Sequence, residues 1–160
     1  MDKKILVIIG HPNLEDSYAN RTIISELEKS SLDLNIRNLS DIYPDYKIDV
    51  AEEQKHMSES DIIVLQFPLF WYSVPAILKH WIDNVFTFGF AFGPEGSKLE
   101  GKKLLPSVTV GSSEKNYLFN EDRNKDESVE SYLKPLHGLA KFASMQPVKP
   151  VYSFNMIYIP

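Results

Sequence analysis

The chain has 160 residues, 43% of them hydrophobic, with a net charge of −5 and a sequence pI near 5.4. Its length and apolar content predict a single domain, residues 1–160, with a hydrophobic core. Its acidic balance argues against a nucleic-acid partner, and the absence of cysteine excludes disulfides, thiolate metal sites and cysteine nucleophiles and favours a cytoplasmic protein.

The first two predicted elements are a strand and a helix. Residues 4–10 form a short, β-branched apolar run that predicts a buried strand, and Asp16 and Ser17 are suited to cap the helix that follows. The loop GHPNLEDS between them predicts an anion site, because the first turn of a helix offers free N–H groups and the positive end of its dipole. His11 at the strand end favours a phosphate contact, with a plain turn histidine as the alternative.

The next elements repeat the alternation of strand and helix. Residues 34–39 alternate weakly and predict an edge strand, residues 40–49 form a polar connection with a proline, and residues 50–59 predict a helix. Together with the strand at 62–67 and the helix after it, this order predicts right-handed crossovers in a parallel, doubly wound α/β sheet.

The stretch from 61 to 86 is the most informative part of the chain. It predicts a buried strand, an aromatic turn at residues 68–73 and a helix that opens at Pro75. Phe70, Trp71 and Tyr72 would lie at the carboxyl end of the strand, where open α/β sheets bind ligands. Their flat rings suggest a flat ligand, and the alternative is that the turn only completes the core.

The second half of the chain predicts two more strands. Residues 104–110 form the fourth strand, with Pro106 as an irregularity, and the small residues 111–113 could bring backbone N–H groups to a ligand. A charged loop at 114–127, a helix at 129–143 and a fifth strand at 151–159 follow. A doubly wound sheet normally carries a fifth helix after that strand; we expect either that this helix is missing here or that another element covers that face.

Four segments resemble those of a known family: GHPNLEDSYAN, FPLFWYSVPAILKHWIDNVF, GFAFGPEGSKLEGKKLL and VTVGSSEKNY. In this order they resemble the flavodoxin-like NAD(P)H:quinone oxidoreductases. The resemblance is greatest to a small bacterial branch of general-stress NAD(P)H oxidoreductases and ancillary subunits of glutathione-gated potassium efflux systems. It implies a flavodoxin-like, five-stranded parallel sheet in the order 2-1-3-4-5.

The resemblance also implies a flavin site built from three loops and a tyrosine. The phosphate would be held by His11, Ser17, Tyr18, Ala19 and Asn20. The isoalloxazine edge would lie on Pro68, Leu69, Phe70 and Trp71. The far side would be closed by Val108, Thr109, Val110 and Gly111. Tyr117 matches a tyrosine that assists hydride transfer, whereas the histidine that follows it in the animal enzymes falls on Arg123. No residue spacing predicts a metal site.

The activity that this resemblance implies is ping-pong hydride transfer from NADPH or NADH to a quinone. FMN is the expected flavin, with FAD as the alternative. A homodimer is also expected, since the loop at 89–101 would expose Phe90 and Phe92. The main alternative is a regulatory flavin-binding subunit of a membrane potassium efflux transporter. An electron-carrier flavodoxin is disfavoured, because the first loop is not a Ser/Thr/Gly phosphate cradle.

Overall fold

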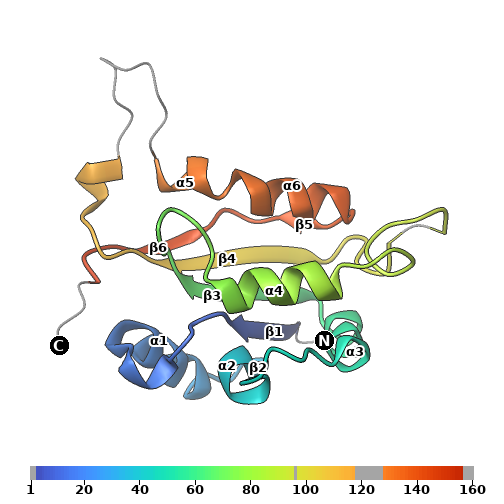
Figure 1. Cartoon of the computed structure of the whole chain (residues 1–160), viewed down its shortest axis with the longest axis horizontal. Coiled ribbons are helices and arrows are strands. Elements are labelled where there is room, and N and C mark those ends of the chain that lie inside the picture. Colours follow the sequence, from blue (N-terminus) through green and yellow to red (C-terminus); the bar gives the residue numbers. More distant parts are fainter. Residues whose placement is uncertain (1–2, 96, 118–127, 157–160) are drawn as a thin grey trace, which may run out of the picture.

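The computed structural model describes residues 3–95, 97–117 and 128–156. Within these ranges it contains one parallel sheet in the order β2-β1-β3-β4, with β5 and β6 both paired to β4 (Figure 1). Because β5 and β6 share one edge position, the sheet has the flavodoxin-like order 2-1-3-4-5. The predicted fold class is thereby confirmed.

The strands and helices alternate along the chain as the sequence predicts. The strands are β1 Lys4–Ile9, β2 Asp33–Asn38, β3 Ile62–Pro68, β4 Lys103–Thr109, β5 Gln146–Pro147 and β6 Val151–Ser153. The α-helices are α1 Tyr18–Glu28, α2 Leu39–Ile42, α3 Val50–Glu59, α4 Ala76–Val85, α5 Val129–Tyr132 and α6 Lys134–Phe142, and two 3₁₀ turns are η1 Leu14–Asp16 and η2 Glu114–Tyr117. Across the described ranges, none of these helices combines the length and the apolarity needed to cross a membrane.

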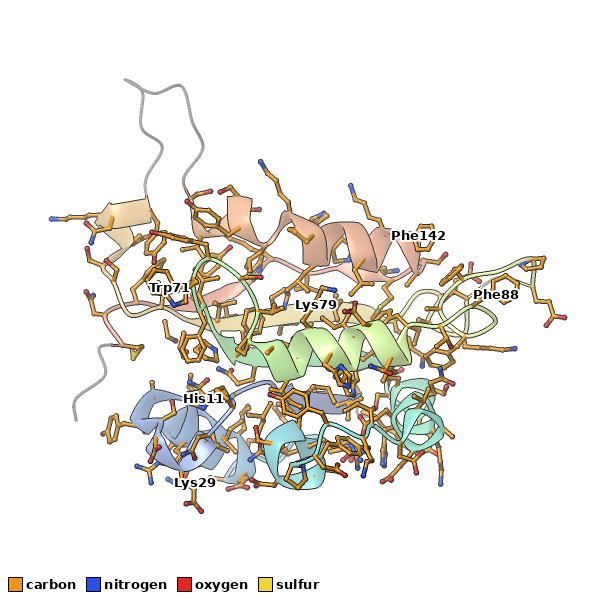
Figure 2. The ribbon with its side chains drawn as sticks, viewed as in Figure 1. His11, Lys29, Trp71, Lys79, Phe88 and Phe142 are labelled. Atoms are coloured by element: carbon orange, nitrogen blue, oxygen red, sulfur yellow. The ribbon has the colours of Figure 1, made fainter. Side chains whose placement is uncertain are left out.

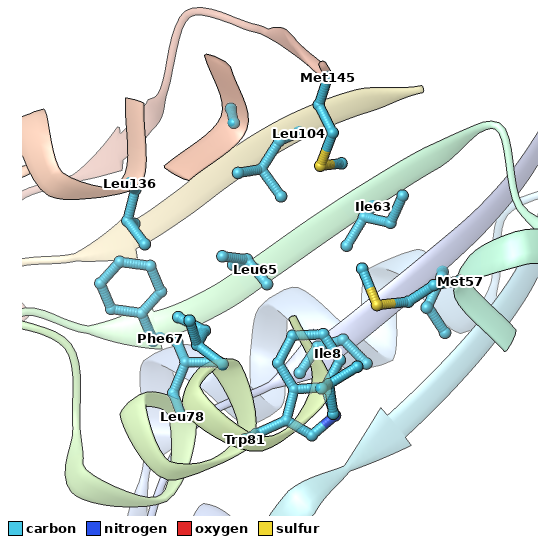
Figure 3. Close-up of a cluster of buried hydrophobic side chains, with 14 of the residues drawn as sticks. Ile8, Met57, Ile63, Leu65, Phe67, Leu78, Trp81, Leu104, Leu136 and Met145 are labelled. Atoms are coloured by element: carbon cyan, nitrogen blue, oxygen red, sulfur yellow. The ribbon is translucent and has the colours of Figure 1, made fainter. Parts of the chain in front are cut away.

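The sheet separates two hydrophobic layers of unequal size. Alternate residues of β1 point to opposite faces, as the strand pleat requires, with Ile8 in the large layer and Val7 in the small one. The large layer contains buried side chains of α3, α4 and α6, including Trp81 and Leu136 (Figure 3). Of the described helices, only α1 and η1 contribute to the small layer, which leaves Val64 half-buried.

A buried ion pair lies under α3 at the β2 side of the sheet. The Glu53 carboxylate is 0% exposed and accepts hydrogen bonds from Arg37 Nε at 2.7 Å, from the Tyr43 hydroxyl at 2.7 Å and from Trp81 Nε1 at 2.8 Å. Burial and the hydrogen bond to Glu53 raise the pKa of Tyr43 to about 12. Arg37 Nη1 also lies 2.9 Å from His56 Nε2. All four elements β2, α2, α3 and α4 are therefore joined in or beside one polar cluster.

Two helical predictions need correction. The predicted helix at 129–143 is interrupted, because Pro135 has no N–H to donate and its ring would clash with the preceding helical turn. The chain therefore forms α5 and α6, with Leu133 between them at φ −94° and ψ 0°. The edge strand was predicted to end at Leu39 and residues 40–49 to form a connection without a helix, but residues 39–42 form α2, and Leu39 is fully buried in the large layer.

The predicted fifth strand, 151–159, is wrong in its extent. The described chain forms β5 and β6 instead, separated by residues 148–150, and residues 157–160 lie outside the described part. The N–H groups of Gln146 and Val148 donate to the C=O groups of Lys102 and Leu104. Pro106 lies two residues after Leu104, so its backbone groups face the same edge segment. Because proline has no N–H, it cannot donate a hydrogen bond to that segment, and the ladder of hydrogen bonds at the edge is interrupted there.

The end of β1 lies directly against α4. A Cβ atom built on Gly10 would be only 2.6 Å from the Cβ of Leu78, well inside van der Waals contact. Residue 10 must therefore be glycine for the two backbones to come this close. Pro75, predicted to open α4, is its N-cap residue, with φ −60° and ψ 155°.

Candidate functional site

Three loops meet at the carboxyl ends of β1, β3 and β4. Backbone hydrogen bonds join their first residues: the Gly10 N–H donates to the Gln66 C=O at 2.9 Å, and the Leu69 N–H donates to the Thr109 C=O at 2.8 Å. The N-terminus of α1 and the turn η2 lie at the same end of the sheet (Figure 1). This is the edge at which open α/β sheets bind ligands.

The first loop ends in a well-formed helix cap with unused amides. Ser17 is the N-cap residue of α1, and its hydroxyl accepts the Asn20 N–H at 3.3 Å. The N–H groups of Tyr18 and Ala19 have no acceptor within the helix, because they precede the first i to i−4 hydrogen bond. Asn20 was predicted to offer its N–H as well, but the cap already uses that group. The open donors of this turn are therefore the two amides that follow Ser17.

His11 is half-buried between the first loop and the aromatic turn. Its Nδ1 accepts the Asn13 N–H at 3.1 Å, which places the proton of the neutral ring on Nε2. Its ring meets the Phe70 ring edge-on at a centroid distance of 5.9 Å. Burial lowers the pKa of His11, with Asp16 acting in the opposite direction. At neutral pH the site therefore presents an imidazole N–H donor.

The side chain of Asn20 connects the cap of α1 to the ends of β3 and β4. It is buried, and its amide group donates to Ser17 Oγ at 2.8 Å and to Thr109 Oγ1 at 3.1 Å. Its carbonyl oxygen accepts from Gln66 Nε2 at 2.8 Å, while Gln66 Oε1 has no hydrogen-bond partner in the described part of the chain. Gln66 was not among the predicted site residues, although a lone polar residue inside the apolar run of β3 was a usable signal.

The aromatic turn is a strained two-residue hairpin. Phe70 and Ser73 exchange backbone hydrogen bonds of 3.1 and 3.0 Å, and between them Trp71 and Tyr72 have φ angles of 46° and 64°. Two positive φ angles are the signature of a type I′ turn, which strongly favours Asn-Gly. Large side chains in this conformation cost on the order of 1 kcal/mol each. Trp71 is also 93% exposed, so its ring gains little burial in this conformation.

Trp71 and His11 lie at the same end of the molecule, far from Phe88 and Phe142 (Figure 2). An exposed Trp71 contradicts the alternative in which the turn only completes the core. Pro68, by contrast, is buried and Leu69 half-buried, so the exposed part of the predicted segment is its aromatic half.

Tyr117 lies in a cluster of aromatic rings beside this turn. Its ring centroid is 6.5 Å from that of Tyr72, 6.4 Å from that of Tyr132 and 6.4 Å from that of Phe154. Burial, with smaller contributions from Tyr72 and Tyr132, raises the pKa of Tyr117, so its hydroxyl keeps its proton and can donate. Tyr117 was predicted as a site residue but its aromatic neighbours were not, and Arg123 lies outside the described residues.

The fourth-strand loop offers backbone groups rather than side chains. Val108, Thr109 and Val110 are buried, and Val110 uses both its N–H, to Ser153, and its C=O, from Met156. Gly111 is exposed, and its N–H meets no acceptor among the described residues. Of the four residues predicted here, Gly111 is therefore the one with an unused donor facing solvent.

A second aromatic group lies at the opposite end of the sheet. The sequence predicted that Phe90 and Phe92 would be exposed, but Phe90 is only 8% exposed and packs into the core. The exposed rings are Phe88, at 69%, and Phe142, at 68%, and half-buried Phe92 lies between them at centroid distances of 5.8 and 5.1 Å. The prediction of an exposed aromatic patch holds for this trio rather than for Phe90.

The described residues contain no group of three or more His, Asp or Glu side chains that could hold a metal ion. The three loops and η2 offer amide donors, an imidazole N–H, flat exposed rings and a protonated phenol. Such a set suits a ligand that combines a phosphate with a planar ring system.

Comparison with known proteins gives the same family as the sequence motifs. Residues 3–159 match the family model described as flavodoxin-like fold. General stress protein 14 of Bacillus subtilis (strain 168) is 40% identical over 97% of this chain and 87% of its own length. The glutathione-regulated potassium-efflux system ancillary protein KefF of Enterobacter sp. (strain 638) is 40% identical over 91% of this chain and 80% of its own.

Two solved structures are also similar. The general stress protein 14 of Treponema denticola, solved in complex with FMN, has a TM-score of 0.88 and 32% identity, covering 94% of this chain and 86% of that one. An NADPH-quinone reductase of P. pentosaceus has a TM-score of 0.84 and 27% identity, covering 98% of this chain and 88% of that one.

Proposed function

The chain belongs to the family with the flavodoxin-like fold, and on this premise we propose that it is an FMN-dependent NAD(P)H oxidoreductase that reduces quinones or similar small acceptors. The observation that carries the proposal is the strained, exposed aromatic turn next to unused amide donors. The FMN complex of one relative and the NADPH-quinone reductase activity named for another support the choice of flavin and substrates.

The described residues fit FMN. The Tyr18 and Ala19 amides, together with the His11 Nε2–H, would hold the phosphate at the positive end of α1. Phe70 and Trp71 would contact the edge of the ring system, and the Gly111 N–H would donate to it from the other loop. FAD remains the second choice, because the phosphate donors and the aromatic turn would serve either flavin.

Bound FMN would supply the redox chemistry by taking a hydride from NADPH or NADH and delivering it to a quinone in alternation. The protein would contribute position and charge stabilisation. The Tyr117 hydroxyl and the Gly111 N–H are donors available for negative charge that develops on a bound ring system. The nicotinamide and the quinone would use one site in turn, beside the exposed Trp71.

The direct test is flavin content and turnover. We expect purified protein, after reconstitution with FMN, to retain a yellow cofactor and to oxidise NADPH or NADH with a soluble quinone. Mass measurement of the compound released by boiling distinguishes FMN from FAD. Failure to bind either flavin after reconstitution would rule the proposal out.

We also propose that the active form is a homodimer. Exposed aromatic patches mark interaction surfaces, and a two-fold pair buries the same patch twice. Phe88, Phe92 and Phe142 form such a patch at the end of the sheet opposite the aromatic turn. We expect Phe92→Glu, and more safely the exposed Phe88→Glu, to give monomers, while Leu32→Glu at another exposed position remains dimeric. Because the patch lies at the end of the sheet opposite Trp71 and His11, FMN binding by these monomers should change little.

The readout for the dimer is analytical ultracentrifugation alongside flavin titration. A wild-type protein that is monomeric at nanomolar concentration and still turns over fully would contradict the dimer. It would leave the oxidoreductase proposal standing.

A second function is favoured by one specific relative. KefF, named as an ancillary protein of a glutathione-regulated potassium-efflux system, is 40% identical to this chain. A regulatory role on a potassium efflux transporter is therefore the alternative. Purification from membranes with a transporter attached, and a change in potassium efflux that survives loss of turnover, would favour it over the enzyme.

A further inference from the structure

A groove lies on the sheet edge, away from the site described above. It has a volume of about 480 Å³ and runs between α6 and the edge formed by β5, β6 and the residues between them, which lie side by side in Figure 1. Its floor is apolar and consists of Leu104, Pro106, Leu136, Pro147, Val148 and Pro150. None of the residues assigned to the flavin lines it, so the groove is a separate feature.

The wall on α6 is cationic, although the whole chain is acidic. Lys134, His137 and Lys141 line it at spacings of three and four residues, so they follow one face of the helix. The side chain of Lys141 forms no hydrogen bond or ion pair with any described residue. Glu130 is an acidic lining residue and lies at the α5 end. Gly138 also lines the groove, and the space beside it is open, since a Cβ there would meet nothing within 4 Å.

We propose that this groove binds an acidic, extended peptide segment of a partner protein. The two lysines are seven residues apart on α6, which is about 10 Å along the helix axis. Residues three apart in an extended chain of the polyproline II type are separated by about 9 Å and point to the same side of the chain. Carboxylates at every third position would therefore face Lys134 and Lys141 together, with apolar side chains between them on the floor.

The distribution of charge is what distinguishes a peptide from a single-headed apolar anion. A fatty acid has one carboxylate and would use one of the two lysines. Two cations spread along a groove with an apolar floor match a ligand with repeated charges and apolar groups between them.

The edge itself does not invite strand pairing. Pro147 and Pro150 have no N–H to donate, and Lys149 between them is exposed, which are features of edges protected from pairing. The peptide would thus be held by its side chains against α6 and the floor. A second copy of this chain, joined edge to edge, is disfavoured for the same reason.

The test is a fluorescence anisotropy titration of the full chain with a labelled nine-residue peptide that has Glu at positions 1, 4 and 7 and Leu or Val between. We expect saturable binding to the wild type and at least tenfold weaker binding to Lys141→Glu. Gly138→Leu, which fills the groove and keeps its charge, should weaken binding as strongly. Lys55→Glu on α3 makes the same charge change elsewhere and should bind within twofold of wild type.

Two further arms separate the remaining explanations. Gly138→Ala should keep wild-type binding and a melting temperature no lower than wild type, which shows that the loss in Gly138→Leu is steric. A peptide with Lys in place of Glu should not bind. The proposal is overturned if the peptide does not bind saturably, if Lys55→Glu weakens binding as much as Lys141→Glu, or if palmitate binds the groove and the peptide does not.

Discussion

The cluster around Glu53 and the turn around Trp71 differ in whether a local cost in free energy is offset by contacts within the protein. At Glu53 a charge with no exposure accepts three hydrogen bonds from Arg37, Tyr43 and Trp81, so every part of a costly burial is compensated. At Trp71 the backbone adopts a conformation suited to glycine, and the ring gains little burial in return.

The contrast separates the parts of the molecule that hold the fold from those that present a ligand surface. A side chain that supports the fold is expected to be costly to remove and irrelevant to binding. A strained, exposed side chain is expected to be the reverse, because the native state loses little and the ligand loses a contact.

The largest expected effect is at Glu53. Glu53→Ala leaves the Arg37 guanidinium buried without its carboxylate and should lower the free energy of unfolding by about 3–5 kcal/mol. Urea denaturation measures this, and FMN affinity of the folded protein should stay within about twofold. Glu52→Ala is the matched control, since that half-exposed carboxylate also reaches Arg37, at 3.1 Å, and should cost less than about 1 kcal/mol.

The reverse pattern is expected at Trp71. Trp71→Gly relieves the positive φ and should raise the free energy of unfolding by about 1 kcal/mol. It should weaken FMN binding by about 1 kcal/mol or more, because a ring contact is lost. Trp71→Ala should weaken binding similarly and change stability little. A drop in the apo melting temperature with unchanged FMN affinity would instead make Trp71 a core residue.

Thr109 tests the region between these two extremes. Thr109→Val keeps the shape but removes the acceptor of the buried Asn20 amide, which should cost about 1 kcal/mol of stability. FMN affinity should fall too, since Asn20 joins the helix cap to the fourth-strand loop. Thr22→Val, at an exposed position of α1 whose hydroxyl donates to the Tyr18 C=O, should change neither quantity. Loss of stability alone would place Thr109 with Glu53.

The smallest effect is the pH dependence contributed by His11. Burial lowers the pKa of His11, so the folded chain binds this proton less readily than the unfolded chain, whose value is near 6.5. The stability that the neutral ring contributes is therefore present above pH 6.5 and is lost as the pH falls below it. Between pH 7.5 and 5.5 the melting temperature of wild type should fall more than that of His11→Gln. Equal falls would show that His11 does not take part.

The regular elements were predictable from sequence because their signals are local. Helix α3 begins and ends where the pattern predicts, with the Asp49 side chain accepting the Glu52 N–H at 3.0 Å. Ser17 likewise caps α1 as predicted. The split of the fifth strand was not predictable in this way, because it depends on Pro106 in another strand.

The site was predictable in its loops but not in its details. The type I′ turn has Trp-Tyr at the two positions where Asn-Gly is strongly preferred, so its backbone conformation could not be predicted from these residue types. The rings around Tyr117 come from positions 72, 132 and 154, and only the tertiary fold brings them together. The Asn20 N–H donates to the Ser17 hydroxyl in the helix cap that the same motif predicts, so it is not available to a ligand.

The close contact between Gly10 and Leu78 limits how the sequence can change. Any side chain at position 10 would overlap Leu78, so single substitutions there are expected to be rejected. A smaller residue at 78 would make room for alanine at 10 and restore packing. The two positions are thus expected to tolerate paired substitutions better than a substitution at position 10 alone. A library that randomises both positions should yield folded variants in which a larger residue at 10 occurs with a smaller residue at 78. Substitutions at the start of the loop that carries His11 are thus expected to be coupled to substitutions in α4, the helix that follows the aromatic turn.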